Sequence, residues 1–295
     1  MRLRVALEQI LAERDLDKVT ADQYRRAELR FSEWLGKAAD SVDLTVANVN
    51  NWIMHLQQKV CGTTARNYRV ALTVIWNHLA GQGQIPHYDS RRLRSPKQTP
   101  HPVRAWTLNQ FAILLASVEK LPGTLRIGIP AKDLMRAWLW VGFDTAFRPS
   151  DLRRLEFCQV DLEAGLIIVT QHKTSQPHAA RIGPESITAL RLIASPDRNL
   201  VFPINKSGVR RWELALYRIA AELGFARFRG QGLGTLRKTH ATEVFRDAGE
   251  NAAAESLGHV GGVRTVRKSY IDSSVRRVGR LPRRPNSVTR SEKRA

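Results

Sequence analysis

Apolar residues recur every three or four positions through the first 85 residues, which is the spacing of amphipathic α-helices. The pattern predicts four helices and an all-helical domain over residues 1–85. Thr20 is placed to cap the second helix, the third covers Val49–Gln58, and the fourth begins at Thr63-Thr64. We interpret the tryptophans of these helices as core residues. The apolar positions are Val5, Leu7, Ile10 and Leu11; Tyr24, Leu29, Phe31, Trp34 and Leu35; Trp52, Ile53 and Leu56; and Tyr68, Leu72, Ile75, Trp76 and Leu79.

The helical pattern stops at residues 86–102, a segment with four prolines, several basic residues and little periodicity. Such a composition predicts an extended linker. The linker could follow a nucleic-acid backbone or simply be solvated, and the segment taken alone favours neither.

Residues 103–272 combine helical patterns with one clear strand signal. Leu166–Thr170 is a run of branched residues that predicts a strand, with Ala179–Ile182 as its hairpin partner and residues 172–177 as the turn. Arg148-Pro149-Ser150-Asp151 has the composition of a helix start. Helices are expected at 108–119, up to about 143, and at 185–193, 209–223, 235–248, 251–257 and 263–270. The fold class is therefore mainly α with a small antiparallel β-sheet, an α+β arrangement.

Charge is the unusual feature of the composition. The formal net charge is +20, and Lys and Arg outnumber Asp and Glu by 5 in residues 1–100, by 3 in residues 101–200 and by 12 in residues 201–295. Such an excess favours polyanionic partners, because phosphate contacts release condensed counterions. A basic surface that only aids solubility is the alternative. Residues 273–295 form a basic tail that is expected to be disordered until it meets a partner.

Cysteine usage and hydropathy narrow the cellular setting. Cys61 and Cys158 are the only cysteines and lie far apart, so neither a disulfide framework nor a zinc site is expected. The first residues lack the apolar core of a signal peptide, and the most apolar stretch, Leu134–Phe143, is short and contains Arg136. We expect a cytoplasmic, nucleoid-associated protein with no membrane partner.

One segment near the C-terminus indicates chemistry. Leu257-Gly258-His259 is followed, eleven residues after the histidine, by Tyr270, and basic residues precede the tyrosine. A phenol has an unperturbed pKa of ~10 and is a poor nucleophile at neutral pH. It becomes useful when cations surround the group that it attacks, so a tyrosine among cations suggests chemistry on a phosphate.

Four segments, in order along the chain, resemble motifs of the tyrosine recombinases, the phage-integrase family. They are Thr145–Leu152 with Arg148, the predicted hairpin with Lys173, Gly234–Thr242 with Arg237, and Leu257-Gly258-His259 with Tyr270. Thr64-Ala65-Arg66-Asn67-Tyr68 also resembles part of the family's SAM-like core-binding domain. The resemblance covers residues 1 to about 272. It implies a core-binding domain over 1–85, a linker over 86–102 and a catalytic domain over 103–272.

The resemblance implies a site-specific recombinase that cleaves and rejoins DNA through a covalent 3′-phosphotyrosine, with no metal, ATP or other cofactor. Tyr270 would attack phosphorus. Arg148 and Arg237 would bind the non-bridging oxygens, for which a guanidinium is suited because it binds bidentately and stays charged. Lys173 would protonate the leaving 5′ oxygen, and His259 would donate a hydrogen bond to a phosphate oxygen.

The implied partners are double-stranded DNA with a specific site, three further protomers in a homotetramer on DNA, and accessory DNA-bending proteins. The basic and polar residues predicted to contact DNA are Arg66, Asn67, Arg69, Arg91, Arg92, Arg94, Lys97, Lys238, Arg264, Arg267 and Lys268.

One position departs from the family pattern. The family usually places a histidine three residues before the second arginine, where this chain has Gly234. His240, one turn beyond Arg237, is a candidate substitute. Two alternative functions remain: a type IB topoisomerase-like enzyme that relaxes DNA, and a DNA-binding member of the family with impaired catalysis, for which Gly234 is the motivation.

Overall fold

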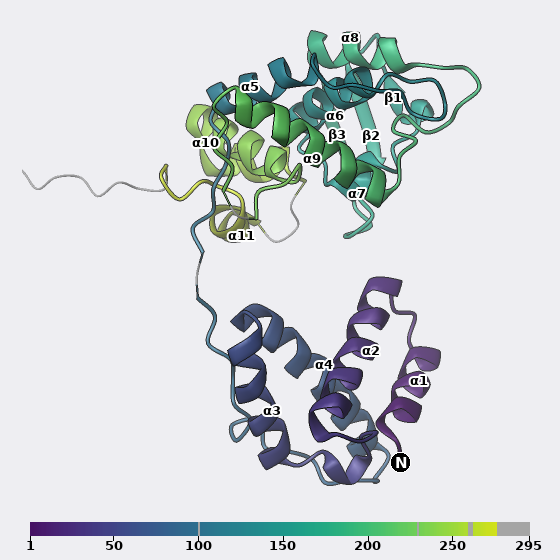
Figure 1. The fold of residues 1–295 in the computed structure, drawn as a ribbon, viewed down its shortest axis with the longest axis vertical. Helices are drawn as coiled ribbons and strands as arrows, with labels where there is room; N and C mark the ends of the chain where they lie inside the picture. Colours follow the sequence, from purple (N-terminus) through teal and green to yellow (C-terminus); the bar gives the residue numbers. More distant parts are fainter. Residues whose placement is uncertain (100, 229, 259–261, 276–295) are drawn as a thin grey trace, which may run out of the picture. The chain divides into compact units, whose positions relative to one another are not determined.

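The computed structural model describes residues 1–99, 101–228, 230–258 and 262–275. The chain forms two compact units, one over Met1–His101 and a second that begins at Pro102 (Figure 1). Each unit has its own hydrophobic core.

The first unit is helical, as predicted. Its elements are α1 (Leu3–Glu13), α2 (Lys18–Leu35), a 3₁₀ turn (Ser41–Asp43), α3 (Val46–Lys59) and α4 (Gly62–Gly81). The expected cap of α2 is wrong, because Asp17 occupies the N-cap and its carboxylate accepts a hydrogen bond from the backbone N–H of Thr20 at 2.9 Å. Thr45 caps α3 in the same way through the N–H of Asn48.

The core of the first unit forms around Trp52, which is fully buried and packs edge-on against Phe31. Trp76 is also buried, as predicted, whereas Trp34 is half-buried. Val5 and Leu29, two of the periodic apolar positions, lie outside this core, with 50% and 53% of their surface exposed. The buried face of α1 consists of Leu3, Ala6, Leu7 and Ile10.

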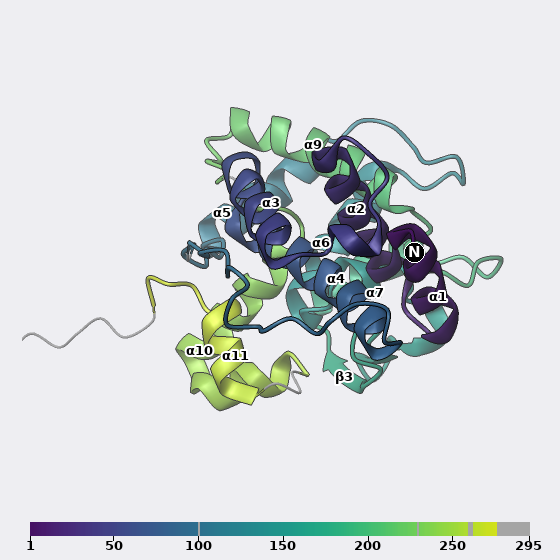
Figure 2. The same ribbon diagram turned by 90° about the horizontal axis from the view of Figure 1, so that it is seen from below.

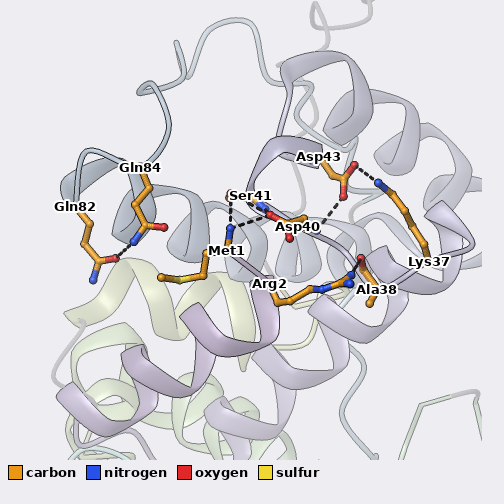
Figure 3. A network of polar contacts seen from close by, with 9 residues as sticks. All are labelled: Met1, Arg2, Lys37, Ala38, Asp40, Ser41, Asp43, Gln82 and Gln84. Atoms are coloured by element: carbon orange, nitrogen blue, oxygen red, sulfur yellow. Dashed lines mark hydrogen bonds and ion pairs between the residues drawn. The ribbon is translucent and has the colours of Figure 1, made fainter.

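A polar network joins the start of α1 to the connection between α2 and α3 (Figure 3). The amino group of Met1 donates to Asp40 at 2.9 Å and to Ser41 at 3.0 Å. Arg2 donates to the carbonyl of Ala38 at 2.8 Å, and Lys37 pairs with Asp43 at 2.8 Å. These contacts fix one end of the helical unit.

Residues 86–99 contain no helix or strand, yet their first part lies on the first unit. Leu93 is buried in its core. Asn50 accepts a hydrogen bond from the N–H of Arg94 at 2.7 Å and donates one to the carbonyl of Arg92 at 2.9 Å. The sequence predicts an extended linker here, and the structure holds residues 86–94 against the helices.

The second unit confirms the predicted fold class, since helices surround a three-stranded antiparallel sheet of order β1-β2-β3. Gly249, with φ 84°, breaks α10 into the two helices expected there. The elements are α5 (Leu108–Val118), α6 (Ala131–Thr145), α7 (Pro149–Leu152), a 3₁₀ turn (Phe157–Gln159), β1 (Val160–Asp161), β2 (Leu166–Thr170), β3 (Pro177–Arg181), α8 (Pro184–Ile193), α9 (Lys206–Glu222), α10 (Thr235–Ser256) and α11 (Gly262–Ser269).

The β2–β3 hairpin has the predicted position. Ile168 pairs with Ala179, and β3 begins at Pro177, two residues earlier than expected. Ile167 and Val169 point into the core while Ile168 is exposed, which is the alternation of a half-buried strand. The two-residue strand β1 has no counterpart in the predictions, because it is too short to form a pattern.

Helix α6 runs through the core of the second unit and packs against α8 and α10. Helices α10 and α11 lie side by side in both views (Figures 1 and 2). Within the described part of the chain, no helix combines the length and the apolar character needed to cross a bilayer.

Candidate active site

Arg237 lies in the first turn of α10 with only 3% of its surface exposed. Its Nη1 donates to the carbonyl of Ala146 at 2.7 Å, and its Nη2 donates to the carbonyl of Leu257 at 2.9 Å. Ala146 has a left-handed conformation, φ 52°, at the C-terminal end of α6. One guanidinium therefore ties together the end of α6, the start of α10 and the end of α10.

Arg148 is the N-cap residue of the short helix α7, with Pro149 at the first helical position as predicted. Its Nη1 donates to Oε1 of Gln171 at 2.7 Å and lies 3.7 Å from a carboxylate oxygen of Asp151. Neither Ser150 nor Asp151 caps the helix; Asp151 is buried beside the guanidinium instead.

Gln171 links the two arginines and was missed by sequence reasoning. It is fully buried at the end of β2. Its Oε1 accepts from Arg148, and its Nε2 donates at 3.2 Å to the carbonyl of Leu257, which also accepts from Arg237. A continuous chain of hydrogen bonds thus runs from Arg148 to Arg237. The only available signal was its position two residues before Lys173.

Tyr270 lies next to Arg237. It follows α11, and the centre of its ring is 5.0 Å from the guanidinium carbon. The ring packs against a small apolar cluster that joins α10 to α11 and includes Leu257 and Val266. The fold therefore brings together Arg148, Arg237 and Tyr270, three of the residues that the sequence singled out.

Burial and the neighbouring charged groups shift the pKa of Arg237. Burial lowers the pKa of the guanidinium, Tyr270 and Asp151 raise it, and the charge of Arg148 lowers it. An arginine nevertheless stays charged at any working pH. Two cations held close together in a buried site are suited to an anionic ligand.

His178 is a second residue that sequence reasoning missed. It lies on β3, 8% exposed, with its ring edge-on to Phe147. A Cβ placed on Gly258 would lie 2.5 Å from Nδ1 of His178 and 2.9 Å from Nε2 of Gln171, so Gly258 is in close contact with both side chains. Burial and then the charge of Arg237 lower the pKa of His178, the carbonyl of Ser256 raises it, and Arg148 lowers it further.

The lowered pKa of His178 predicts a pH-dependent stability. Below the unfolded pKa of about 6.5, the unfolded chain takes up a proton that the folded chain resists. The free energy of unfolding should therefore fall as the pH drops from about 7 towards 5, by at most about 1.4 kcal/mol per pH unit for this histidine. Urea unfolding at several pH values should show a flatter profile for His178→Gln. An unchanged profile would exclude His178 as a source of the pH dependence. His240→Gln measures the part that comes from His240, whose pKa is also lowered.

Two further candidates, Lys173 and His240, belong to the turn after β2 and to α10. Lys173 is exposed in the turn between β2 and β3. His240 has its Nδ1 2.7 Å from the carbonyl of Phe143, and its ring borders an open pocket that also includes Asp144 and Arg181. Burial, above all, lowers the pKa of His240. His259 and residues 276–295 of the tail lie outside the described residues.

The residues predicted to contact DNA are mostly exposed. In the second unit, Arg264 and Lys268 are exposed on α11, Lys238 is partly exposed, and Arg267 pairs with Glu250 at 2.9 Å. In the first unit, Arg69 is half-buried. The exposed ones there are Arg66, Asn67, Arg91, Arg92, Arg94 and Lys97.

Gly234 immediately precedes α10 with φ −64° and ψ −11°, a conformation open to any residue. A Cβ at this position would meet nothing closer than Pro149, at 3.8 Å. The backbone conformation and the nearest atoms therefore accommodate a Cβ where the family usually has a histidine.

Comparisons with known proteins establish the fold. No family model and no curated protein matches the chain. A solved lambda integrase dimer bound to a COC′ core site superposes with a TM-score of 0.73 at 18% identity, covering 96% of this chain and 99% of that one. The Tn1549 transposon integrase in complex with transposon right end DNA gives a TM-score of 0.69 at 15% identity, covering 91% of this chain and 94% of that one. The XerH site-specific recombinase bound to its difH substrate gives a TM-score of 0.65 at 17% identity, covering 85% of this chain and 75% of that one.

The chain thus has the fold of the integrase-type DNA recombinases, and the resemblance seen in the sequence is confirmed at the level of the fold. Both units take part in the match to lambda integrase, because it spans 96% of the chain.

Proposed function

We propose that this protein is a site-specific DNA recombinase that cleaves and rejoins DNA through a covalent 3′-phosphotyrosine. The observation that carries the proposal is the position of Tyr270 beside the buried Arg237, which is linked through the Leu257 carbonyl and Gln171 to Arg148. The net charge of +20 supports a polyanionic substrate.

The two guanidiniums would bind the scissile phosphate. Arg237 uses one N–H of Nη1 and one of Nη2 for carbonyls, and its buried Nε has no hydrogen-bond partner among the described residues. A buried N–H without a partner is costly, and a phosphate oxygen would satisfy it. Arg148 is 17% exposed at its side chain and would bind a second oxygen. Both charges would stabilise the transition state, in which negative charge accumulates on these oxygens.

The reaction would exchange one phosphodiester for another. As Tyr270 loses its phenolic proton to solvent, its oxygen bonds to phosphorus while the bond to the 5′ oxygen breaks, and that oxygen leaves with a proton that we assign to Lys173. His259 would donate a hydrogen bond to the phosphate. Attack of a 5′ hydroxyl on the phosphotyrosine reverses the step and reseals the strand, so the bond energy is conserved and no ATP is required.

The proposed partners are duplex DNA and further copies of the chain. Lambda integrase has been solved as a dimer bound to a core site and as a tetramer bound to a Holliday junction. We propose the same tetrameric assembly here, with accessory DNA-bending proteins as further partners. The exposed cations of α11, Arg264 and Lys268, are proposed to contact the DNA backbone near the site.

Gly234 favours a second candidate function, a DNA-binding member of the fold with weak catalysis. General acid–base assistance is worth about 10²–10⁴ in rate, and Gly234 cannot supply it. His240 remains a proposed substitute. Its ring is held against the carbonyl of Phe143, which limits its reach.

Gly234→His should therefore raise the rate of strand cleavage, by roughly 10–100-fold, because a Cβ fits at this position and the backbone needs no change. Single-turnover formation of the covalent adduct measures the effect. Gly234→Ala is the matched control and should leave the rate unchanged. An equal rate in all three proteins would show that the missing histidine does not limit catalysis.

The proposed function is tested by trapping the covalent intermediate. Bound duplexes selected from a random pool identify the site, and a nicked version of that duplex loses the released strand and so accumulates adduct. We expect an adduct that denaturing gels resolve, absent in Tyr270→Phe. No adduct on a tightly bound site would favour the DNA-binding function. Plasmid relaxation without strand exchange between two sites would favour a topoisomerase-like enzyme.

A further inference from the structure

The segment that directly follows Tyr270 is tied to the beginning of the second unit. The carboxylate of Asp272 accepts a hydrogen bond from the N–H of Ala105 at 2.6 Å. The N–H of Ser273 donates to the carbonyl of Val103 at 2.9 Å, and the hydroxyl of Ser273 accepts from the N–H of Val103 at 2.8 Å. Residues 272–274 are called the anchor turn below, and they bind a segment about 170 positions earlier in the chain.

The same two segments are tied to α10, the helix that carries Arg237. The N–H of Asp272 donates to the hydroxyl of Thr242 at 3.0 Å, and the N–H of Trp106 donates to the hydroxyl of Thr239 at 3.0 Å. Both threonines are buried. The anchor turn is therefore attached to the same helix that carries Arg237.

The anchor turn is internally braced as well. The second carboxylate oxygen of Asp272 accepts from the N–H and from the hydroxyl of Ser274, each at 2.8 Å. Burial raises the pKa of Asp272, but these hydrogen bonds and the one from Ala105 lower it more. The pKa of the carboxyl therefore lies below its ordinary value. A charged acceptor with three N–H or O–H donors binds strongly.

Tyr270 depends on this turn for its position. Asp272 lies two positions after it, a span of at most about 7 Å, so fixing Asp272 restricts the tyrosine. On its other side lies α11, which has eight residues and buries Val266 alone among them. A helix of this length is not stable by itself. The anchor turn therefore helps to hold the tyrosine, together with the apolar cluster that includes Val266 and Ile271.

We propose that Asp272 is a positioning residue, which holds Tyr270 against Arg237 of the same chain through its bonds to Ala105 and Thr242. Its catalytic consequence rests on the proposed function, whereas the position of the tyrosine can be measured without DNA. Loss of the carboxylate removes the bond to Ala105 and should loosen the tyrosine segment, while the backbone bond to Thr242 and the two arginines stay in place.

Fluorine NMR of protein labelled with 3-fluorotyrosine tests the position directly. The chain has five tyrosines, and Tyr270→Phe identifies the resonance of Tyr270. In Asp272→Ala this resonance should move towards that of an exposed tyrosine, while that of Tyr217, buried in the core of the same unit, should stay unchanged. An unmoved Tyr270 resonance would overturn the proposal.

A second variant covers the case in which Asp272→Ala does not fold, which a shifted Tyr217 resonance would report. Ser273→Ala removes only the acceptor for the N–H of Val103, and it should move the Tyr270 resonance less far in the same direction. No movement in this variant would also overturn the proposal. Ser207→Ala is the control, because its hydroxyl bonds to Asn205 at the start of α9 and to no residue of the anchor turn; it should leave Tyr270 in place.

Cleavage separates this inference from the proposed function. In Asp272→Ala the single-turnover rate of adduct formation should fall at least 10-fold, with the affinity for the DNA site unchanged within about twofold. An adduct that forms at the wild-type rate would contradict the positioning role. A moved Tyr270 resonance with no adduct from the wild-type protein would instead support the anchor and refute the recombinase.

Discussion

Arg237→Lys should reduce covalent cleavage of the cognate DNA by about 10²–10³-fold or more, even though it keeps the positive charge. Arg237 uses a planar fork to reach the carbonyls of Ala146 and Leu257 and still offers its Nε. An ammonium is a point charge on a flexible stem and cannot make both contacts while facing a phosphate. The measurement is the single-turnover rate of adduct formation at saturating protein.

The same substitution should also lower the free energy of unfolding, by about 1–3 kcal/mol, because a buried carbonyl is left without its donor. The control is Arg218→Lys, which changes an exposed arginine of α9 and should alter neither quantity. Wild-type cleavage by Arg237→Lys would contradict the assignment of the phosphate site to this guanidinium.

Gly258→Ala should damage the site without touching a residue assigned to chemistry. Gly258 has φ 55°, where an alanine is strained by about 1–2 kcal/mol. The new Cβ would also lie 2.5 Å from His178 and 2.9 Å from Gln171. Because Gln171 joins Arg148 to the Leu257 carbonyl, its displacement should separate the two arginines. We expect cleavage to fall by roughly 10²-fold and the unfolding free energy to fall by more than the strain alone.

Gly224→Ala is the matched control for this second effect. Gly224 also has a positive φ, 83°, but a Cβ there would meet no atom within 4 Å. Gly224→Ala should therefore lower the free energy of unfolding by the strain alone and keep the wild-type cleavage rate. Urea unfolding and single-turnover cleavage measure the two variants. If Gly258→Ala behaves like Gly224→Ala in both, the contact with Gln171 and His178 does not support the site.

The parts of the fold that could be predicted were those with a repeating pattern. The helices of the first unit and strand β2 follow from apolar spacing, and Arg148 at the start of α7 follows from Pro149. Where several neighbouring residues could each cap a helix, the pattern did not identify the capping residue. Asp17, and not Thr20, caps α2, although both residue types cap helices. Strand β1 exists only through its pairing with β2.

The supporting residues of the site could not be predicted, because nothing in the local sequence distinguishes them. Gln171 becomes important only when β2 brings it between Arg148 and Leu257. His178 becomes important because Gly258, 80 residues later, leaves space for its ring. Asp272 acts on a segment at the other end of the unit. Each depends on a long-range contact, whereas Arg148, Arg237 and Tyr270 belong to recognisable motifs.

The central claim is that Tyr270 becomes covalently attached to DNA, and peptide mapping of the trapped adduct tests it most directly. Protein trapped on a nicked cognate duplex would be digested with protease and nuclease and analysed by mass spectrometry. The account predicts a residual nucleotide on the peptide that contains Tyr270, and no adduct in Tyr270→Phe. An adduct on any other residue, or one that persists in Tyr270→Phe, would contradict it.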